Sequence, residues 1–258
     1  MKSGYLQAVF QKLTQSDTAI LNVETDTLFF HDNDAPIDNI LVKGITFTGT
    51  LLNAGPFPGT SVMFSHPSNN ATFADCHWVD MIAPIGLLSV FQNDFQQALG
   101  VPVADHSIHL SLVECRFARI DYDRALIHVK GQNLTIHATT FSDVNVTFLS
   151  STAQDCDYTR DNNTFANGCA GLLYCASTSF CEVRDTCIED FEYQGPGLFH
   201  SSHSASVDID NVYHVFYSNF REATAHSSEG CDWAVLEPNQ LSVCRDVLQG
   251  ATTCPAFY

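Results

Sequence analysis

Five segments of the chain repeat one nine-residue pattern, and this repeat constrains the fold more than any other feature. Each segment alternates apolar residues with others and ends in a large apolar anchor. The segments span 39–47, 70–78, 109–117, 133–141 and 180–188, with anchors Phe47, Trp78, Phe117, Phe141 and Ile188. A second short apolar strand accompanies each segment, with no helix between the two. Self-similarity at a period of roughly 20 to 50 residues indicates a solenoid, and strands without helices indicate a β-helix.

Aligning the segments on their anchors predicts the core. Apolar pairs lie seven and five positions before each anchor: Ile40/Val42, Ala71/Phe73, Leu110/Leu112, Leu134/Ile136 and Cys181/Val183. Side chains two residues apart on a strand share a face, so these pairs should stack inward at the strand spacing of about 4.8 Å. The anchors are 31, 39, 24 and 47 residues apart, so the longer coils should carry loops, which we place at 93–106 and 150–170. Such loops often form the binding surface of a solenoid.

The two ends of the chain differ from the repeat. Leu6, Val9, Phe10 and Leu13 have helical spacing, which predicts a capping helix over the open end of the core. We therefore divide the chain into an N-terminal cap with the first strands (1–36), β-helix coils (37–220) and a C-terminal cap (221–258). Residues 206–216 should form a sixth, irregular coil.

Charge and composition exclude several classes of function. Lys and Arg total 11 against 29 Asp and Glu, a formal net charge of −18, which disfavours nucleic acid and anionic lipid as partners. No apolar run approaches the length of a membrane span. Ten cysteines and several glycosylation sequons favour an extracellular or cell-surface location. The opening MKSGYLQAVFQK has no apolar signal region, which suggests a mature piece, a fragment or an incomplete gene model.

The chain has ten cysteines, an even number, and no CxxC pair of the kind that forms a zinc ribbon. All ten are therefore disulfide candidates. Cys76 and Cys115 share a position two before the anchor, where either a disulfide or a buried thiol ladder is expected. A second group of cysteines should form disulfides that hold the loop at 150–170. A third group should form disulfides in the C-terminal cap. The remaining candidates are Cys156, Cys169 and Cys175 for that loop, Cys181 and Cys187 beyond it, and Cys231, Cys244 and Cys254 in the cap.

Four asparagines lie in sequons, at Asn70, Asn133, Asn145 and Asn162. Asn70 and Asn133, with Asn39, lie eight positions before their anchors, which predicts a ladder of buried asparagine amides that bond from coil to coil. A buried amide cannot carry a glycan. We therefore expect glycosylation at Asn145 and Asn162, in predicted loops.

The opening YLQAVFQKLTQSDTAILNVETDTLFF resembles the capping helix and first strand of right-handed parallel β-helix proteins. The coils NILVKGITFTG and NLTIHATTFSD are similar to the repeated strands of that pectin-lyase-like superfamily. The resemblance covers about residues 4–216. It implies an all-β, single-stranded, right-handed parallel β-helix with a short N-terminal capping helix and a cysteine-rich C-terminal cap. The superfamily includes polysaccharide lyases, glycoside hydrolases, epimerases and non-catalytic surface proteins, so the fold does not select an activity.

Charged residues follow four of the five anchors by two positions. The residues there are Gly49, Asp80, Arg119, Asp143 and Asp190. If the coils are in register, Asp80, Arg119 and Asp143 form an acid–base–acid column on the solvent side. Paired carboxylates can serve general acid/base catalysis and glycoside hydrolysis. The structural alternative is an exposed ion ladder in which Arg119 neutralises both neighbours.

A second candidate site is the predicted turn Asp121–Tyr122–Asp123–Arg124. Asp121 and Asp123 could hold Ca²⁺ while Arg124 or Arg119 binds a substrate carboxylate, as in a calcium-dependent lyase. A DxD sequence is also a common turn former. The GHG and RIK-like strings of the superfamily's pectin hydrolases are absent, which counts against that activity.

The leading hypothesis is an extracellular β-helix that binds polysaccharide, or another matrix partner, without catalysis. The alternatives are a polysaccharide lyase or hydrolase using these Asp and Arg residues, and a structural matrix protein. No cofactor other than Ca²⁺ is expected.

Overall fold

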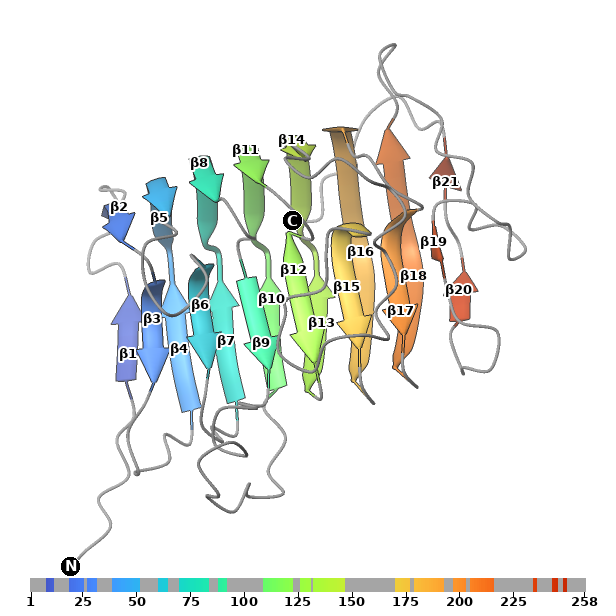
Figure 1. Cartoon of the computed structure of the whole chain (residues 1–258), viewed down its shortest axis with the longest axis horizontal. Helices are drawn as coiled ribbons and strands as arrows, with labels where there is room; N and C mark the ends of the chain where they lie inside the picture. The colour runs from blue at the N-terminus through green and yellow to red at the C-terminus, as the bar shows by residue number, and fades with distance from the viewer. Residues whose placement is uncertain are drawn as a thin grey trace, which may run out of the picture.

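The computed structural model describes the strands and the short turns between them. The described ranges are 8–11, 19–25, 27–31, 39–51, 60–64, 70–83, 88–91, 109–122, 126–130, 132–146, 170–176, 179–192, 197–202, 205–215, 234–235, 243–245 and 248–249. These ranges hold strands and no helix, and so no helix able to cross a membrane. The strands lie side by side along the long axis of the molecule (Figure 1). The prediction of an all-β parallel solenoid is confirmed.

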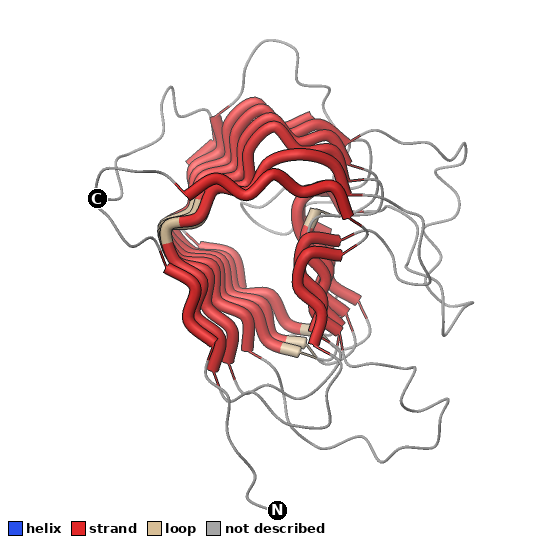
Figure 2. Tube along the Cα trace, turned by 90° about the vertical axis from the view of Figure 1, so that its left-hand side faces the viewer, coloured by secondary structure: helices blue, strands red, loops and turns tan. Residues whose placement is uncertain are grey.

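Each coil contributes three strands that enclose the core, as the view along the axis shows (Figure 2). The first strands are β4 (Asn39–Lys43), β7 (Asn70–Ala74), β10 (His109–Val113), β13 (Asn133–His137) and the starts of β16 (Phe180–Glu192) and β18 (Ser206–Val215). The second strands are β5 (Ile45–Leu51), β8 (His77–Ala83), β11 (Arg116–Tyr122), β14 (Thr140–Val146) and the ends of β16 and β18. The third strands form a separate sheet: β3 (Thr27–His31), β6 (Thr60–Phe64), β9 (Leu88–Phe91), β12 (Ile127–Lys130), β15 (Ala170–Ala176), β17 (Gly197–Ser202) and β19 (Ala234–Val235).

The nine-residue repeat is therefore two strands and not one. The chain bends at the sixth residue of the repeat, where φ is positive and lies between 48° and 66° in six successive coils: Gly44, Asp75, Glu114, Ala138, Asp185 and Asn211. Glycine, aspartate and asparagine tolerate this left-handed conformation. Glu114 and Ala138 adopt it because backbone hydrogen bonds to the next coil hold them there, from Glu114 N–H to His137 O at 3.0 Å and from Ala138 N–H to Arg184 O at 3.2 Å.

The anchor alignment predicted the register correctly. Phe47 pairs with Trp78, Trp78 with Phe117, Phe117 with Phe141 and Phe141 with Ile188. All five anchors are fully buried. The ring centroids of Trp78 and Phe117 are 4.7 Å apart, as are those of Phe117 and Phe141. Aromatic rings therefore stack from coil to coil through the core.

The expected N-terminal helix is wrong for residues 8–11. They form β1 (Ala8–Gln11), which pairs in parallel with β4, while β2 (Ala19–Thr25) pairs with β5 and β3 with β6. A coil of the same kind thus precedes the first repeat that the pattern detected. The helical spacing of four apolar residues is a weak local preference. Hydrogen bonding of β1 along the edge of β4 overrides it, because tertiary contacts can outweigh local propensity.

Short strands of the tail continue the stack. β20 (Val243–Arg245) and β21 (Leu248–Gln249) pair with β18, and β19 pairs with β17. Apart from Ala170, which begins β15, the predicted loops at 93–106 and 150–170 lie outside the described residues. The boundaries at residues 36 and 220 remain predictions.

The cysteine predictions divide into three outcomes. Cys175 and Cys181, six residues apart, form a disulfide that ties β15 to β16, and Cys187 is also disulfide-bonded. Cys175 is thus not a staple of the preceding loop. Cys156, Cys169, Cys231 and Cys254, and the side chain of Cys244, lie outside the described residues.

The disulfide alternative for Cys76 and Cys115 is wrong, and the thiol ladder is confirmed. Both are free and buried. Cys76 Sγ donates to Ala74 O at 3.4 Å, and Cys115 Sγ donates to Phe73 O at 3.3 Å. Desolvation raises the pKa of the Cys76 thiol to about 11 and that of the Cys115 thiol further still. Both are inert core residues under ordinary conditions.

Candidate functional site

The predicted charge column exists and lies on the second strands. Asp80, Arg119 and Asp143 occupy one level of β8, β11 and β14, and the backbone pairing passes over each of them. All three have positive φ, of 55°, 53° and 52°. Because neighbouring strands skip one residue each at this level, the register is kept, and the three strands bend together at a left-handed residue whose side chain is exposed. Gly49 does not join this column, because it pairs with Met81.

Arg119 and Asp80 form a two-pronged ion pair. Arg119 Nε lies 2.5 Å from Asp80 Oδ1, and Nη2 lies 3.0 Å from Oδ2. The hydrogen bond from Arg119 lowers the pKa of the Asp80 carboxyl below its usual value. The same bond raises the pKa of Arg119, and the charge of Asp143 adds to that rise. All three side chains are exposed.

This chemistry favours an ion ladder. A glycosidase needs one carboxyl whose pKa is raised so that it can donate a proton. Asp80 is shifted in the opposite direction, because its guanidinium partner stabilises the charged form. A catalytic role of the column nevertheless stays a prediction.

The Asp121 motif is only partly within the described structure. Asp121 is exposed and lies in strand β11, paired with Ile82 and Asn145, so it is not in a turn as predicted. Asp123 and Arg124 lie outside the described residues. Among the residues that are described, no three His, Cys, Asp or Glu side chains gather in a way that could hold a metal ion.

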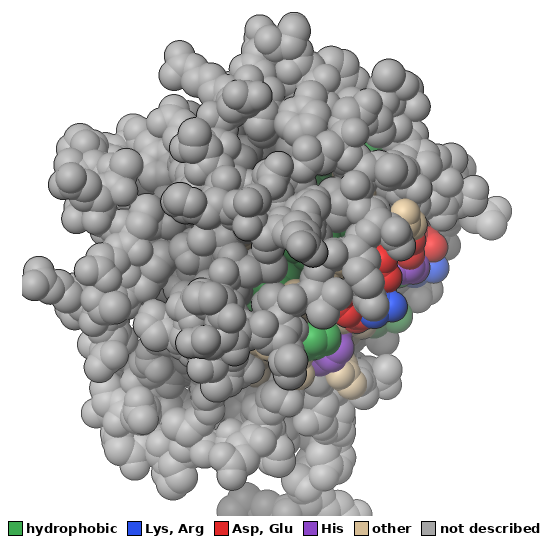
Figure 3. Space-filling view, turned by 90° about the vertical axis from the view of Figure 1, so that its right-hand side faces the viewer, with side chains coloured by type: hydrophobic (Ala, Val, Ile, Leu, Met, Phe, Trp, Pro, Cys, Tyr) green, Lys and Arg blue, Asp and Glu red, His purple; other side chains and the backbone are tan. Residues whose placement is uncertain are grey.

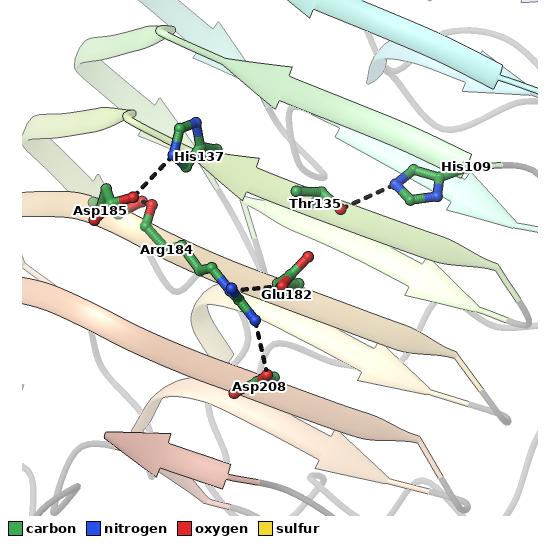
Figure 4. Close-up of polar contacts among 8 residues, drawn as sticks. His109, Thr135, His137, Glu182, Arg184, Asp185 and Asp208 are labelled. Atoms are coloured by element: carbon green, nitrogen blue, oxygen red, sulfur yellow. Dashed lines mark hydrogen bonds and ion pairs between the residues drawn. The ribbon is translucent and has the colours of Figure 1, made fainter. Parts of the chain in front are cut away.

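A second surface lies on the outward side of the first strands. We call it the central face and define it by His109, Ser111, Asn133, Thr135 and Phe180. Backbone pairing places His109 beside Asn133, Ser111 beside Thr135, and Asn133 beside Phe180. His109 Nε2 lies 3.0 Å from Thr135 Oγ1, as Figure 4 shows. Phe180 is 43% exposed, and the other four side chains are half-buried.

Next to the central face lies a charged end, defined by His137, Glu182, Arg184, Asp185 and Asp208. Arg184 Nε lies 2.6 Å from Glu182 Oε1, and Nη2 lies 3.4 Å from Asp208 Oδ2. His137 Nε2 lies 2.9 Å from Asp185 Oδ2 (Figure 4). In Figure 3 a band of acidic, basic and histidine side chains runs along one side of the described surface.

The Asp185 carboxylate also contacts the next coil. Asn211 Nδ2 donates to Asp185 Oδ1. Asp185 and Asn211 both occupy the left-handed corner between the first and second strands. Polar contacts at this corner therefore link successive coils.

Sequence reasoning missed the central face and the charged end. Apart from Asp185, which lies at the corner at offset five, their members lie at offsets zero, two and four from the first residue of the repeat, the positions that alternate with the buried residues. The anchor alignment contains this signal, because alternation along a strand sends these offsets to the solvent side. The buried offsets of the same alignment mark the core on the opposite side of each strand.

Of the predicted ladder of buried asparagine amides, the pairing of Asn39 with Asn70 is confirmed, whereas the burial and the direct continuation to Asn133 are wrong. The register places His109 between Asn70 and Asn133, and Asn70 is exposed. Asn145 lies in strand β14 and not in a loop, and Asn162 lies outside the described residues. Glycosylation at Asn145 and Asn162 stays a prediction.

Comparison with protein-family models, with curated proteins and with solved structures found no match for the chain. The resemblance to the pectin-lyase-like superfamily thus rests on the repeat pattern, and the structure supports a parallel β-solenoid.

Proposed function

We propose that this chain is an extracellular solenoid that binds polysaccharide on the central face without cleaving it. The observation that carries the proposal is the composition of that face. Imidazole, amide and hydroxyl groups lie in two columns on neighbouring strands, beside the exposed ring of Phe180. Binding sites for small molecules and glycans combine apolar area with a few placed hydrogen-bonding groups.

The geometry of the face suits an extended ligand. Parallel strands repeat about every 4.8 Å, so equivalent side chains recur along the solenoid axis. A glycan presents hydroxyls and apolar ring faces repeatedly along its length. Phe180 supplies an aromatic surface for a ring face, and His109 and Asn133 supply donors and acceptors for hydroxyls. The strands hold these groups rigidly, which lowers the entropy lost on binding.

The charges favour a neutral polysaccharide over an acidic one. Arg184 already contacts both Glu182 and Asp208, so its charge is compensated within the protein. The chain as a whole carries a formal charge of −18, which repels polyanions. A uronic acid polymer would therefore bind more weakly than a neutral glycan of the same shape.

The test is affinity electrophoresis and calorimetry against a panel of neutral and acidic polysaccharides. Phe180→Ala should weaken binding about tenfold, or roughly 1.4 kcal/mol, because it removes the aromatic surface. Ile82→Ala is the matched control, since Ile82 is an apolar side chain 52% exposed on a different strand set. Equal effects of the two substitutions would rule out the central face as the binding surface.

The same panel is then assayed for depolymerisation, with and without Ca²⁺, by unsaturated-product absorbance and reducing ends. Product that disappears in Asp143→Asn would replace our proposal with an enzyme acting at the Asp80–Arg119–Asp143 column. Absence of both binding and product across the panel would favour a structural matrix role.

A further inference from the structure

The first sequon of the chain lies on a fully described strand. In β7 the burial alternates: Asn70 is exposed, Ala71 is buried, and Thr72 is half-buried. The two sequon residues thus face outward while Ala71, with no exposed surface, fills the core. An Asn-x-Thr triplet on an outward strand face can carry a glycan without disturbing the core.

A second sequon has the same strand geometry but a different environment. Asn133 is half-buried on β13, between His109 on one side and the partly exposed Phe180 on the other. The hydroxyl of its own sequon residue, Thr135, already contacts His109. Of the two sequons whose asparagine side chains are described, the one at Asn70 has the more exposed asparagine.

We propose that the Asn70 side chain is an N-glycosylation site. The co-substrate is an oligosaccharide linked to a lipid diphosphate. The Asn70 amide nitrogen forms a bond to the anomeric carbon of the sugar, the bond from that carbon to the diphosphate oxygen breaks, and the lipid diphosphate leaves. The amide proton passes to a base of the transferring enzyme. The inference rests on the extracellular route in our proposed function.

The position of Asn70 has a consequence for the central face. Asn70 pairs with His109, the first residue of that face, one strand away. A glycan on Asn70 would border the face on the side of the N-terminal coils. It would limit how far a bound polysaccharide extends toward β4 while leaving Asn133 and Phe180 accessible.

The experiment is secretion of the full chain from a eukaryotic cell line behind a cleavable leader. Enzymatic deglycosylation in heavy-oxygen water converts each occupied asparagine to a labelled aspartate, and peptide mass spectrometry locates the label. We expect the label at residue 70 in most secreted molecules. The gel shift on deglycosylation should shrink by one glycan in Thr72→Ala and be restored in Thr72→Ser, which keeps the sequon.

An unlabelled Asn70 in the secreted, folded protein overturns the inference, whether or not other sequons are occupied. Polysaccharide binding by the deglycosylated protein is measured separately. Binding with an unoccupied Asn70 overturns this inference alone, and an occupied Asn70 without binding overturns the proposed function alone.

Discussion

Truncating one ring of the aromatic stack should greatly lower the free energy of unfolding, and the loss of protection should be greatest in the neighbouring coils. Phe117 has no exposed surface and lies between Trp78 and Phe141, with both ring-centroid distances at 4.7 Å and interplanar angles of 2° and 12°. Removing a buried Phe side chain costs about 3–5 kcal/mol. Two ring pairs account for about 1–3 kcal/mol of that, at about 0.5–1.5 kcal/mol each. Phe117→Ala should therefore lower the free energy of unfolding by about 3–5 kcal/mol, and Phe117→Leu by about 1–3 kcal/mol.

Urea denaturation followed by tryptophan fluorescence measures both values. Hydrogen exchange adds the location, because each coil of a solenoid contacts only its neighbours. Protection should fall first in β8 and β14, the strands that flank β11. Ile82→Ala, at a side chain 52% exposed, is the control and should change stability by no more than about 0.5 kcal/mol. A cost below about 1 kcal/mol for Phe117→Ala would refute the buried ladder and with it the coil alignment.

Three further predictions follow from single features. Trp78→Phe should lower the free energy of unfolding by less than about 1.5 kcal/mol. Trp78 Nε1 is buried and no described group accepts its hydrogen bond, so removing that N–H group offsets the loss of packing volume. Urea denaturation measures the change, and a loss near 4 kcal/mol would contradict this reasoning. Arg119→Gln should move the pKa of the Asp80 carboxyl back up toward 3.8, as carboxyl NMR titration would show. Because the pKa of Asp80 is lowered in the folded protein, the stabilisation by this pair is fully present above the ordinary pKa of 3.8 and is lost as the pH falls through the lowered pKa. An unchanged titration would exclude the ion pair. Replacing both Cys175 and Cys181 by Ser should lower the free energy of unfolding by about 2 kcal/mol, the loop-closure entropy expected for a disulfide between residues six positions apart. Thermal unfolding with and without reductant tests this value.

The repeat was sufficient to predict the architecture and register. Alternation of apolar residues and the recurring anchors reflect burial on one side of a strand, which is a local property that the sequence records directly. For the same reason the pairing of Phe47 with Trp78 and of Phe117 with Phe141 follows from the sequence alone.

Other features depended on contacts between coils and could not be derived from any one segment. The bend at Ala138 has no local sequence signal, and the neighbouring coils impose it through backbone hydrogen bonds such as Ala138 N–H to Arg184 O at 3.2 Å. The strand at 8–11 forms because an open strand edge at β4 pairs with it, which overrides a weak helical spacing.

The candidate sites divide in the same way. The sequence determined that Asp80, Arg119 and Asp143 share a level, because level is a count of residues from the anchor. Only the tertiary structure decided that Arg119 forms its two-pronged ion pair with Asp80, and that Asn70 is exposed while Asn133 is half-buried between its neighbours. The physical reason is that position along a strand is a property of the chain, whereas the exposure and partners of a side chain depend on the residues that other coils, 24 to 47 positions away, bring beside it.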